Sequence, residues 1–145
     1  MAISAIDENG NPVDWWFMYK VSGESQTSNG AKVSGTEYVY FDANDPADGK
    51  LALSAYQVDK SGTLFNTLSQ IYTADNPDFG WYCYTDENPI TGQVNGERGH
   101  TKGVLAFDLA TDSAFWLIHS TPKFSPKGVY GYPDTGIKMA QTLLC

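Results

Sequence analysis

The feature that most constrains this chain is a polar, glycine-flanked segment that runs directly into an apolar one, at residues 99–108 (Gly-His-Thr-Lys-Gly-Val-Leu-Ala-Phe-Asp). The apolar run at residues 104–107 predicts a short strand that is buried on both faces. Because residues two apart in a strand point the same way, we expect His100 and Lys102 side by side where this strand begins. An imidazole beside a fixed positive charge suits phosphodiester chemistry. The lysine holds the anion, and the histidine supplies a nucleophile or a proton.

The chain has two histidines, and the second one, His119, closes another apolar strand, predicted at residues 114–120. If the two strands are neighbours, both imidazoles reach one site; the sequence permits this adjacency without showing it. Spacing alone leaves a plain alternative open, because a histidine and a lysine at the end of a surface strand are common in proteins without any catalytic role.

The coarse pattern of the chain predicts an α/β or α+β fold, with a mixed β-sheet flanked by helices. Strands are expected at residues 13–20, 36–42 and 79–85. Apolar residues at helical spacing predict a helix at residues 61–74 with Ser61 as its N-cap, and a second, short helix is expected at residues 135–145. At 145 residues the chain is one domain by length, and no run of 18 apolar residues predicts a membrane span.

Together these segments resemble the first catalytic half of the deoxyribonuclease II family, which is related to the phospholipase D superfamily. The resemblance implies a metal-independent enzyme without a cofactor that cuts DNA best in acid and leaves 3′-phosphates. It also implies that residues 1–145 are one half of a pseudo-dimer. The resembling stretches run in order along the chain, at residues 10–20, 66–72, 99–104, 115–124 and 141–145.

The resemblance also implies roles for particular residues. His100 and Lys102 correspond to the His-x-Lys motif of the phospholipase D type. In the mechanism expected from the family, a neutral histidine attacks phosphorus to form a phosphohistidine. A second, protonated histidine then gives its proton to the leaving 5′-oxygen, and Lys102 stabilises the transition state. His119 is expected as a supporting histidine. Asp108 stands one position later than the aspartate of the superfamily pattern, and it either orients a histidine or caps the strand.

Family enzymes have two such halves, with the active site at their interface, whereas this chain holds one motif. We therefore expect a second half, either a cleaved C-terminal polypeptide or an identical copy. The cleaved chain is favoured because the resemblance follows the N-terminal half. Two further residues are candidates for contacting DNA. Lys123 lies in a proline-stiffened basic loop and Asn66 on the predicted helix; both also fit solvated surface positions.

The net charge of −8 counts against a nucleic-acid enzyme, because DNA-binding proteins usually carry a basic patch. The acidic residues cluster in turn-rich stretches, however, and the basic ones concentrate late in the chain, at Arg98, Lys102, Lys123, Lys127 and Lys138. Two rival functions therefore remain: a non-catalytic half that binds DNA or a protein, and a phospholipase D-type lipid phosphodiesterase.

The remaining patterns concern metals, cysteines and location. The chain contains no zinc-ligand spacing, complete calcium loop or phosphate-cradling glycine motif. Family members pair their late cysteine with one near the N-terminus, but Ala5 stands there in this chain, so Cys145 is free, paired with Cys83 or paired with another chain. No glycosylation sequon is present. Residues 1–4 lack the basic and apolar regions of a signal peptide, so none is expected within this sequence. The missing sequon favours a secreted or periplasmic bacterial protein over a lysosomal one.

Overall fold

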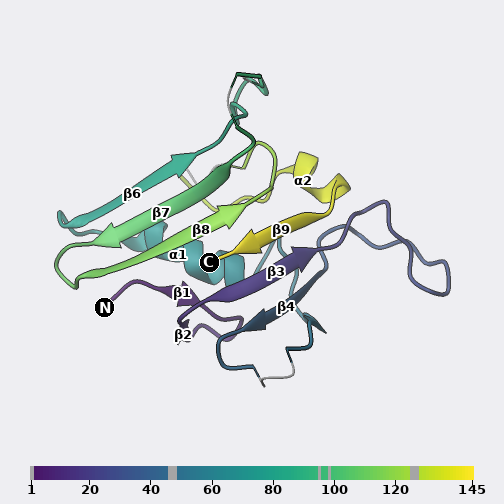
Figure 1. Cartoon of the computed structure of the whole chain (residues 1–145), viewed down its shortest axis with the longest axis horizontal. Coiled ribbons are helices and arrows are strands. Elements are labelled where there is room, and N and C mark those ends of the chain that lie inside the picture. Colours follow the sequence, from purple (N-terminus) through teal and green to yellow (C-terminus); the bar gives the residue numbers. More distant parts are fainter. Residues whose placement is uncertain (1, 46–48, 95, 98, 125–127) are drawn as a thin grey trace.

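A computed structural model describes residues 2–45, 49–94, 96–97, 99–124 and 128–145. The large sheet has seven strands in the order β5-β4-β3-β9-β8-β7-β6, and each neighbouring pair is antiparallel. Figure 1 shows β4, β3, β9, β8, β7 and β6 lying side by side. The fold is therefore α+β, as predicted, although the described strands include no parallel pair of the kind that a mixed sheet has. The strands are β3 (Trp16–Lys20), β4 (Tyr38–Asp42), β5 (Ala52–Leu53), β6 (Phe79–Tyr84), β7 (Lys102–Asp108), β8 (Ser113–His119) and β9 (Gln141–Leu144).

One face of the sheet is covered by helix α1 (Thr63–Thr73), which lies behind the sheet in Figure 1. Its apolar side chains Leu64, Leu68 and Ile71 are buried, as the helical spacing predicts. Thr67 Oγ1 accepts a hydrogen bond of 3.1 Å from Trp16 Nε1 and one of 3.0 Å from the amide of Ile6. These bonds tie the helix to β3 and to a small two-stranded sheet, β1 (Ala5–Ile6) with β2 (Pro12–Val13).

The start of α1 differs from the prediction. Gly62, not Ser61, is the N-cap residue, and no side chain caps the helix there. Gly62 has a φ of 95°, a conformation that glycine adopts at little cost, and a Cβ at this position would collide with the Tyr38 hydroxyl. The helix therefore begins at a position that only a glycine fits.

The prediction of a helix at residues 135–145 is wrong. Helix α2 (Asp134–Lys138) has only five residues, and β9 follows it as a strand. β9 pairs with β3 on one side and with β8 on the other, so it lies in the middle of the sheet. The hydrogen bonds and inward packing of Gln141 and Leu143 outweigh the weak helical pattern of this segment.

The outer face of the sheet is not covered by any described part of the chain. Leu105 and Phe107 are each 38% exposed, so the expectation that residues 104–107 are buried on both faces is wrong for this chain taken alone. Residues that pair directly across strands share a face. By this register the outer positions of β4, β3, β9, β8, β7 and β6 are all uncharged: Val39, Phe41, Phe17, Tyr19, Thr142, Leu144, Ala114, Trp116, Ile118, Gly103, Leu105, Phe107, Gly80, Tyr82 and Tyr84.

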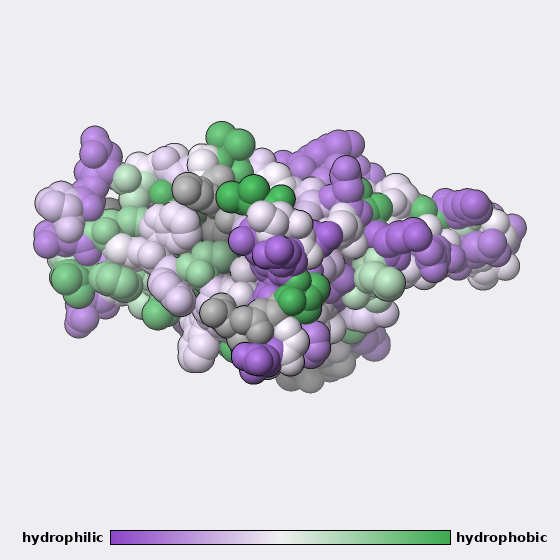
Figure 2. Space-filling view, turned by 90° about the horizontal axis from the view of Figure 1, so that it is seen from above, coloured by the Kyte–Doolittle hydropathy of each residue, from purple (hydrophilic) through white to green (hydrophobic). Residues whose placement is uncertain are grey.

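Lys20 is a fully buried lysine on the inner face. Its Nζ donates to the carbonyl oxygens of Val21, Gly35 and Ile137 at 2.9 to 3.0 Å. Burial lowers the pKa of Lys20 to about 8. These bonds fix the base of the long connection between β3 and β4, which projects from the body of the molecule and is largely hydrophilic (Figure 2).

Both cysteines are free. Burial raises the pKa of the Cys145 thiol to about 12 and also raises that of Cys83. No helix in the described part of the chain has the length and hydrophobicity needed to cross a membrane.

Candidate active site

The connection between β6 and β7, at residues 85–101, carries a carboxylate that joins the two residues of the motif. Asp86 lies just after β6, and β7 begins at Lys102. His100 Nδ1 is 2.7 Å from Asp86 Oδ2, and Lys102 Nζ is 2.5 Å from Asp86 Oδ1. The structure therefore places His100 and Lys102 together, one on each oxygen of a single carboxylate.

The three side chains differ sharply in exposure. The His100 side chain is 81% exposed, whereas those of Lys102 and Asp86 are 5% and 1% exposed. Burial by itself would raise the pKa of Asp86, but the hydrogen bonds and charge of Lys102, with the hydrogen bond to His100, hold it below its ordinary value. The carboxylate thus stays ionised under the buried ammonium, and the imidazole is presented to solvent above it.

The packing around the residue after Lys102 explains why it is a glycine. Gly103 lies directly opposite Tyr84 of β6, on the outer face. A Cβ at Gly103 would come within 2.4 Å of the Tyr84 hydroxyl and 2.5 Å of the Leu117 carbonyl oxygen. The Tyr84 hydroxyl in turn accepts a 3.0 Å hydrogen bond from Trp116 Nε1. A side chain at Gly103 would therefore displace the strand at the point where it delivers Lys102.

His119 is on the strand next to the motif. β7 and β8 are antiparallel neighbours, and His119 lies directly opposite Lys102. His119 is 5% exposed, and its ring packs edge-on against the Phe124 ring, with 5.2 Å between the ring centroids. Within the described residues, neither of its ring nitrogens makes a hydrogen bond of normal geometry. Burial, together with the charge of Lys102, lowers the pKa of His119 to about 4. His119 is therefore a neutral histidine above this pH.

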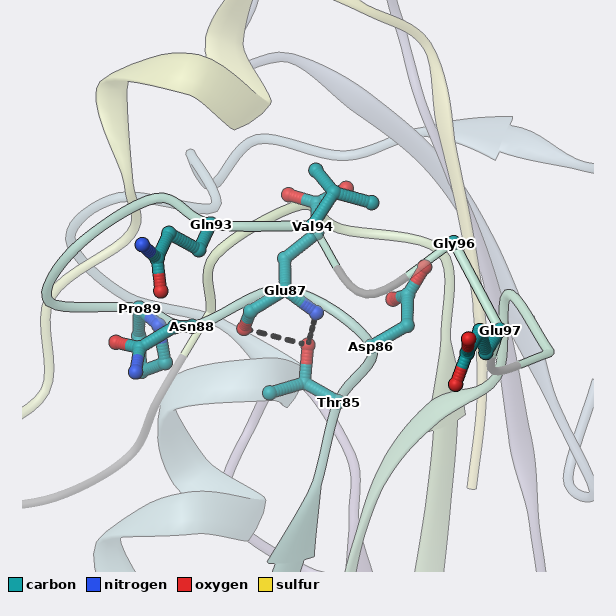
Figure 3. A pocket seen from close by; sticks show the side chains of 9 residues that line it. All are labelled: Thr85, Asp86, Glu87, Asn88, Pro89, Gln93, Val94, Gly96 and Glu97. Atoms are coloured by element: carbon teal, nitrogen blue, oxygen red, sulfur yellow. Dashed lines mark hydrogen bonds between the residues drawn. The ribbon is translucent and has the colours of Figure 1, made fainter.

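A hollow of about 730 Å³ opens beside the motif, between the arms of the connection (Figure 3). Three acidic residues line it, Asp86, Glu87 and Glu97. The carboxylates of Asp86 and Glu87 face Lys102 Nζ, at 2.5 and 3.9 Å. A smaller hollow of about 180 Å³ adjoins Asp86, Gly99 and Thr101 on the side of the motif. The His100 side chain, which is 81% exposed, is the part of the motif that solvent reaches.

The structure brings Lys123 near this region but not the two other candidates. A Cβ at Gly92 would meet Lys123 Nζ at 3.1 Å, so the amine lies against the connection that carries Asp86. Asp108 is at the opposite end of β7, where it caps the turn through the amide of Ala110 and accepts bonds from Asn76. By strand geometry that end is roughly 20 Å from Lys102.

Asn66 is also held apart from the motif. Its side-chain amide donates to the carbonyl oxygens of Asp7 and Glu8, at 2.9 and 3.2 Å, and so fixes the turn between β1 and β2. These contacts occupy the amide within the fold. Of the other late basic residues, Arg98 and Lys127 lie outside the described residues.

Asp86 is the residue that the sequence reasoning missed. It stands in a polar, acidic stretch, 14 residues before His100, and no spacing rule marks it as a partner of the motif. The only available signal was the length of the connection before the motif, which suggested a loop with a function. Among the described residues, no three or more His, Cys, Asp or Glu side chains gather as a metal site would require.

Comparison with known proteins identifies the family of this chain. The sequence profile of Deoxyribonuclease II matches residues 4–145. This chain belongs to the deoxyribonuclease II family. Relatives include a putative deoxyribonuclease-2 of Burkholderia thailandensis, 41% identical over the whole of this chain, and cell-death-related nuclease 7 of Caenorhabditis elegans, 40% identical over 99% of it. Deoxyribonuclease-2-beta of Rattus norvegicus is 38% identical over 99% of the chain.

The relatives are much longer than this chain. This chain spans 41%, 36% and 40% of the three relatives, which are therefore more than twice as long as the segment they share with it. The shared segment includes the whole of β7 and β8, with the motif, and the Asp86 connection.

Proposed function

We propose that this chain is one half of a deoxyribonuclease II-type endonuclease, which hydrolyses DNA phosphodiesters without a metal and leaves 3′-phosphates. The observation that carries the proposal is the arrangement of His100 and Lys102 on one buried carboxylate, in a chain that the family profile matches almost end to end. An exposed imidazole above a buried ammonium suits attack on a phosphodiester, because the nucleophile faces solvent and a positive charge lies behind it.

In the proposed reaction His100 attacks phosphorus and forms an N–P bond, while the bond to the 5′-oxygen breaks. A protonated histidine gives its proton to that oxygen. Water, deprotonated by the same group, then hydrolyses the phosphohistidine, so the phosphate remains on the 3′-oxygen. His119 has a supporting role in this scheme. With a pKa of about 4 it is neutral in mildly acidic solution, which is unsuited to the proton donor.

The proton donor is then supplied by a second half, either a separate C-terminal chain or an identical copy. Two observations support a partner. The described part of this chain contains one motif of this kind, and the outer face of the sheet is uncharged and uncovered. Antiparallel sheets that face water usually carry polar residues on that side, whereas this face has the composition of an interior.

The test is nicking of supercoiled plasmid in EDTA from pH 4 to 8, with the wild type, His100→Ala and Lys138→Ala. Metal-independent nicking that is lost in His100→Ala supports the proposal, and Lys138→Ala controls for the loss of a charged surface side chain on α2. His100→Ala keeps the fold, because this side chain is exposed. Undiminished nicking by His100→Ala would contradict the proposed role.

If the chain alone does not nick, addition of the remaining part of the Burkholderia thailandensis relative tests the need for a second half. Salt-sensitive DNA binding without cleavage at any pH identifies a non-catalytic binding half instead. Cleavage of phosphatidylcholine but not of DNA identifies a lipid phosphodiesterase. For location, we propose a secreted or periplasmic protein, with a lysosomal one as the alternative; detection of the protein in fractionated cells decides between them.

A further inference from the structure

The carboxylate of Asp86 is placed to do more than neutralise a lysine. Among the described residues, the His100 ring has one hydrogen-bond partner, Asp86. A carboxylate that is ionised can accept hydrogen bonds but not donate them. The 2.7 Å contact from Asp86 Oδ2 to Nδ1 therefore requires a proton on Nδ1. The neutral imidazole that results has its free electron pair on Nε2.

We propose that Asp86 is a positioning residue of this family site: it holds His100 in the Nδ1-protonated tautomer, so that Nε2 faces the substrate as the nucleophile. The catalytic part of this inference rests on the proposed function, whereas the tautomer does not. The His100 side chain is 81% exposed, so packing against the described residues does little to fix its ring. One hydrogen bond thus selects both the orientation and the reactive nitrogen.

Lys102 makes this support rigid. Its ammonium lies 2.5 Å from Asp86 Oδ1, so the second oxygen of the carboxylate is occupied and the group cannot rotate freely. Lys102 is itself fixed as the first residue of β7, paired with His119 of β8. The sheet therefore holds the lysine, the lysine holds the carboxylate, and the carboxylate holds the histidine. The contacts with Lys102 and His100 hold the pKa of Asp86 below its ordinary value of 3.8, so its carboxylate is an acceptor above that pH.

Glu87 provides a matched control. It is the next residue along the same connection, and its carboxylate lies 3.9 Å from Lys102 Nζ. Among the described contacts of Glu87, none is with His100. Asp86→Asn and Glu87→Gln therefore each remove one negative charge beside the same lysine, but only the first changes the partner of the imidazole.

The experiment is nitrogen-15 NMR of the imidazole rings, at a pH where they are neutral, together with plasmid nicking. The chain has two histidines, so a His100→Gln variant assigns the signals. We expect the Nδ1-protonated form of His100 in the wild type and in Glu87→Gln. In Asp86→Asn the amide can donate to Nδ1, so we expect the Nε2-protonated form and a loss of nicking by at least about 100-fold.

Asp86→Glu keeps an anionic acceptor, and we expect it to restore the wild-type tautomer and nicking to within about tenfold. An Nε2-protonated His100 in the wild type would overturn the inference without any variant. So would an Asp86→Asn protein that keeps the tautomer while losing activity, or one that nicks at the wild-type rate. If the wild type does not nick even after the remaining part of the Burkholderia thailandensis relative is added, the proposed function fails, and the tautomer comparison alone decides whether Asp86 positions His100.

Discussion

The two faces of the large sheet differ in where they carry charged side chains, which lie on the buried face and not on the exposed one. The buried inner face contains charged and titratable side chains, including Lys20, Lys102 and His119. The exposed outer face, by register, contains no charged side chain from β4 to β6. Charge is tolerated inside because Lys20 and Lys102 have specific partners. The comparison teaches that the inner face carries the site and that the outer face has the composition of a contact surface.

The largest effect is expected from breaking the buried ion pair of the inner face. Lys102→Met leaves the Asp86 carboxylate buried without its ammonium, so we expect the free energy of unfolding to fall by about 3–5 kcal/mol. Urea unfolding of each variant measures this free energy. Lys138→Met is the control, because its 3.7 Å contact with Glu24 joins two exposed side chains and contributes little. Equal stabilities of the two variants would show that the buried pair is not special.

The next prediction concerns how the stability of the inner face depends on pH through His119. The pKa of His119 in the folded chain is about 4, below its ordinary value of 6.5. The unfolded chain therefore binds a proton between these values that the folded chain does not. The stability contributed by neutral His119 is fully present above pH 6.5 and is lost as the pH falls through 4. We expect a loss of about 3 kcal/mol over this range, measured by urea unfolding at each pH.

His119→Leu is the control for this pH dependence. It removes the titrating group but keeps an apolar side chain beside Phe124, so the fall between pH 6.5 and 4 should be much flatter. The separate loss from Asp86 remains, because its lowered pKa places that loss at still lower pH, below 3.8. An unchanged slope in His119→Leu would assign the acid sensitivity to another group.

A smaller difference in stability is expected between substitutions on the two faces of a single strand, β7. Val104 is fully buried on the inner face of β7, and its neighbour Leu105 is on the outer face. We expect Val104→Ala to lower the free energy of unfolding by about 2 kcal/mol and Leu105→Ala by less than about 1 kcal/mol, although leucine loses more atoms. Urea unfolding of the isolated chain gives both values. The reverse order would mean that the outer face is already packed.

The smallest effect on stability is expected at the centre of the outer face. Trp116 of β8 is 56% exposed and lies opposite Leu105. Trp116→Lys should change the free energy of unfolding by less than about 1 kcal/mol, but it should reduce the binding of a dye that reports exposed apolar surface. Leu109→Lys, in the turn after β7, is the matched control, because it adds the same charge away from this face. A large loss of stability in Trp116→Lys would contradict an uncovered face.

The sequence predicted those parts of the fold that have a local pattern. The apolar runs of β7 and β8 and the helical spacing of α1 are local, and the predicted elements appear at those places. β9 was misread because its four residues become a strand only through pairing with β3 and β8. In the site, His100 and Lys102 form a short motif. Asp86 does not, because its contact with them depends on how the whole connection folds back.

The position of β9 has a consequence for how the protein is made. β9 follows all the other strands in the sequence, yet it is the link between β3 and β8 (Figure 1). During synthesis, β3–β4–β5 and β6–β7–β8 emerge first as two antiparallel meanders, and the edges at β3 and β8 stay unpaired until β9 joins them. At about 5–20 residues per second, the ribosome needs roughly 1 to 5 s to pass from His119 to Leu144. The edges of β3 and β8 therefore remain open until the central strand of the sheet has been made.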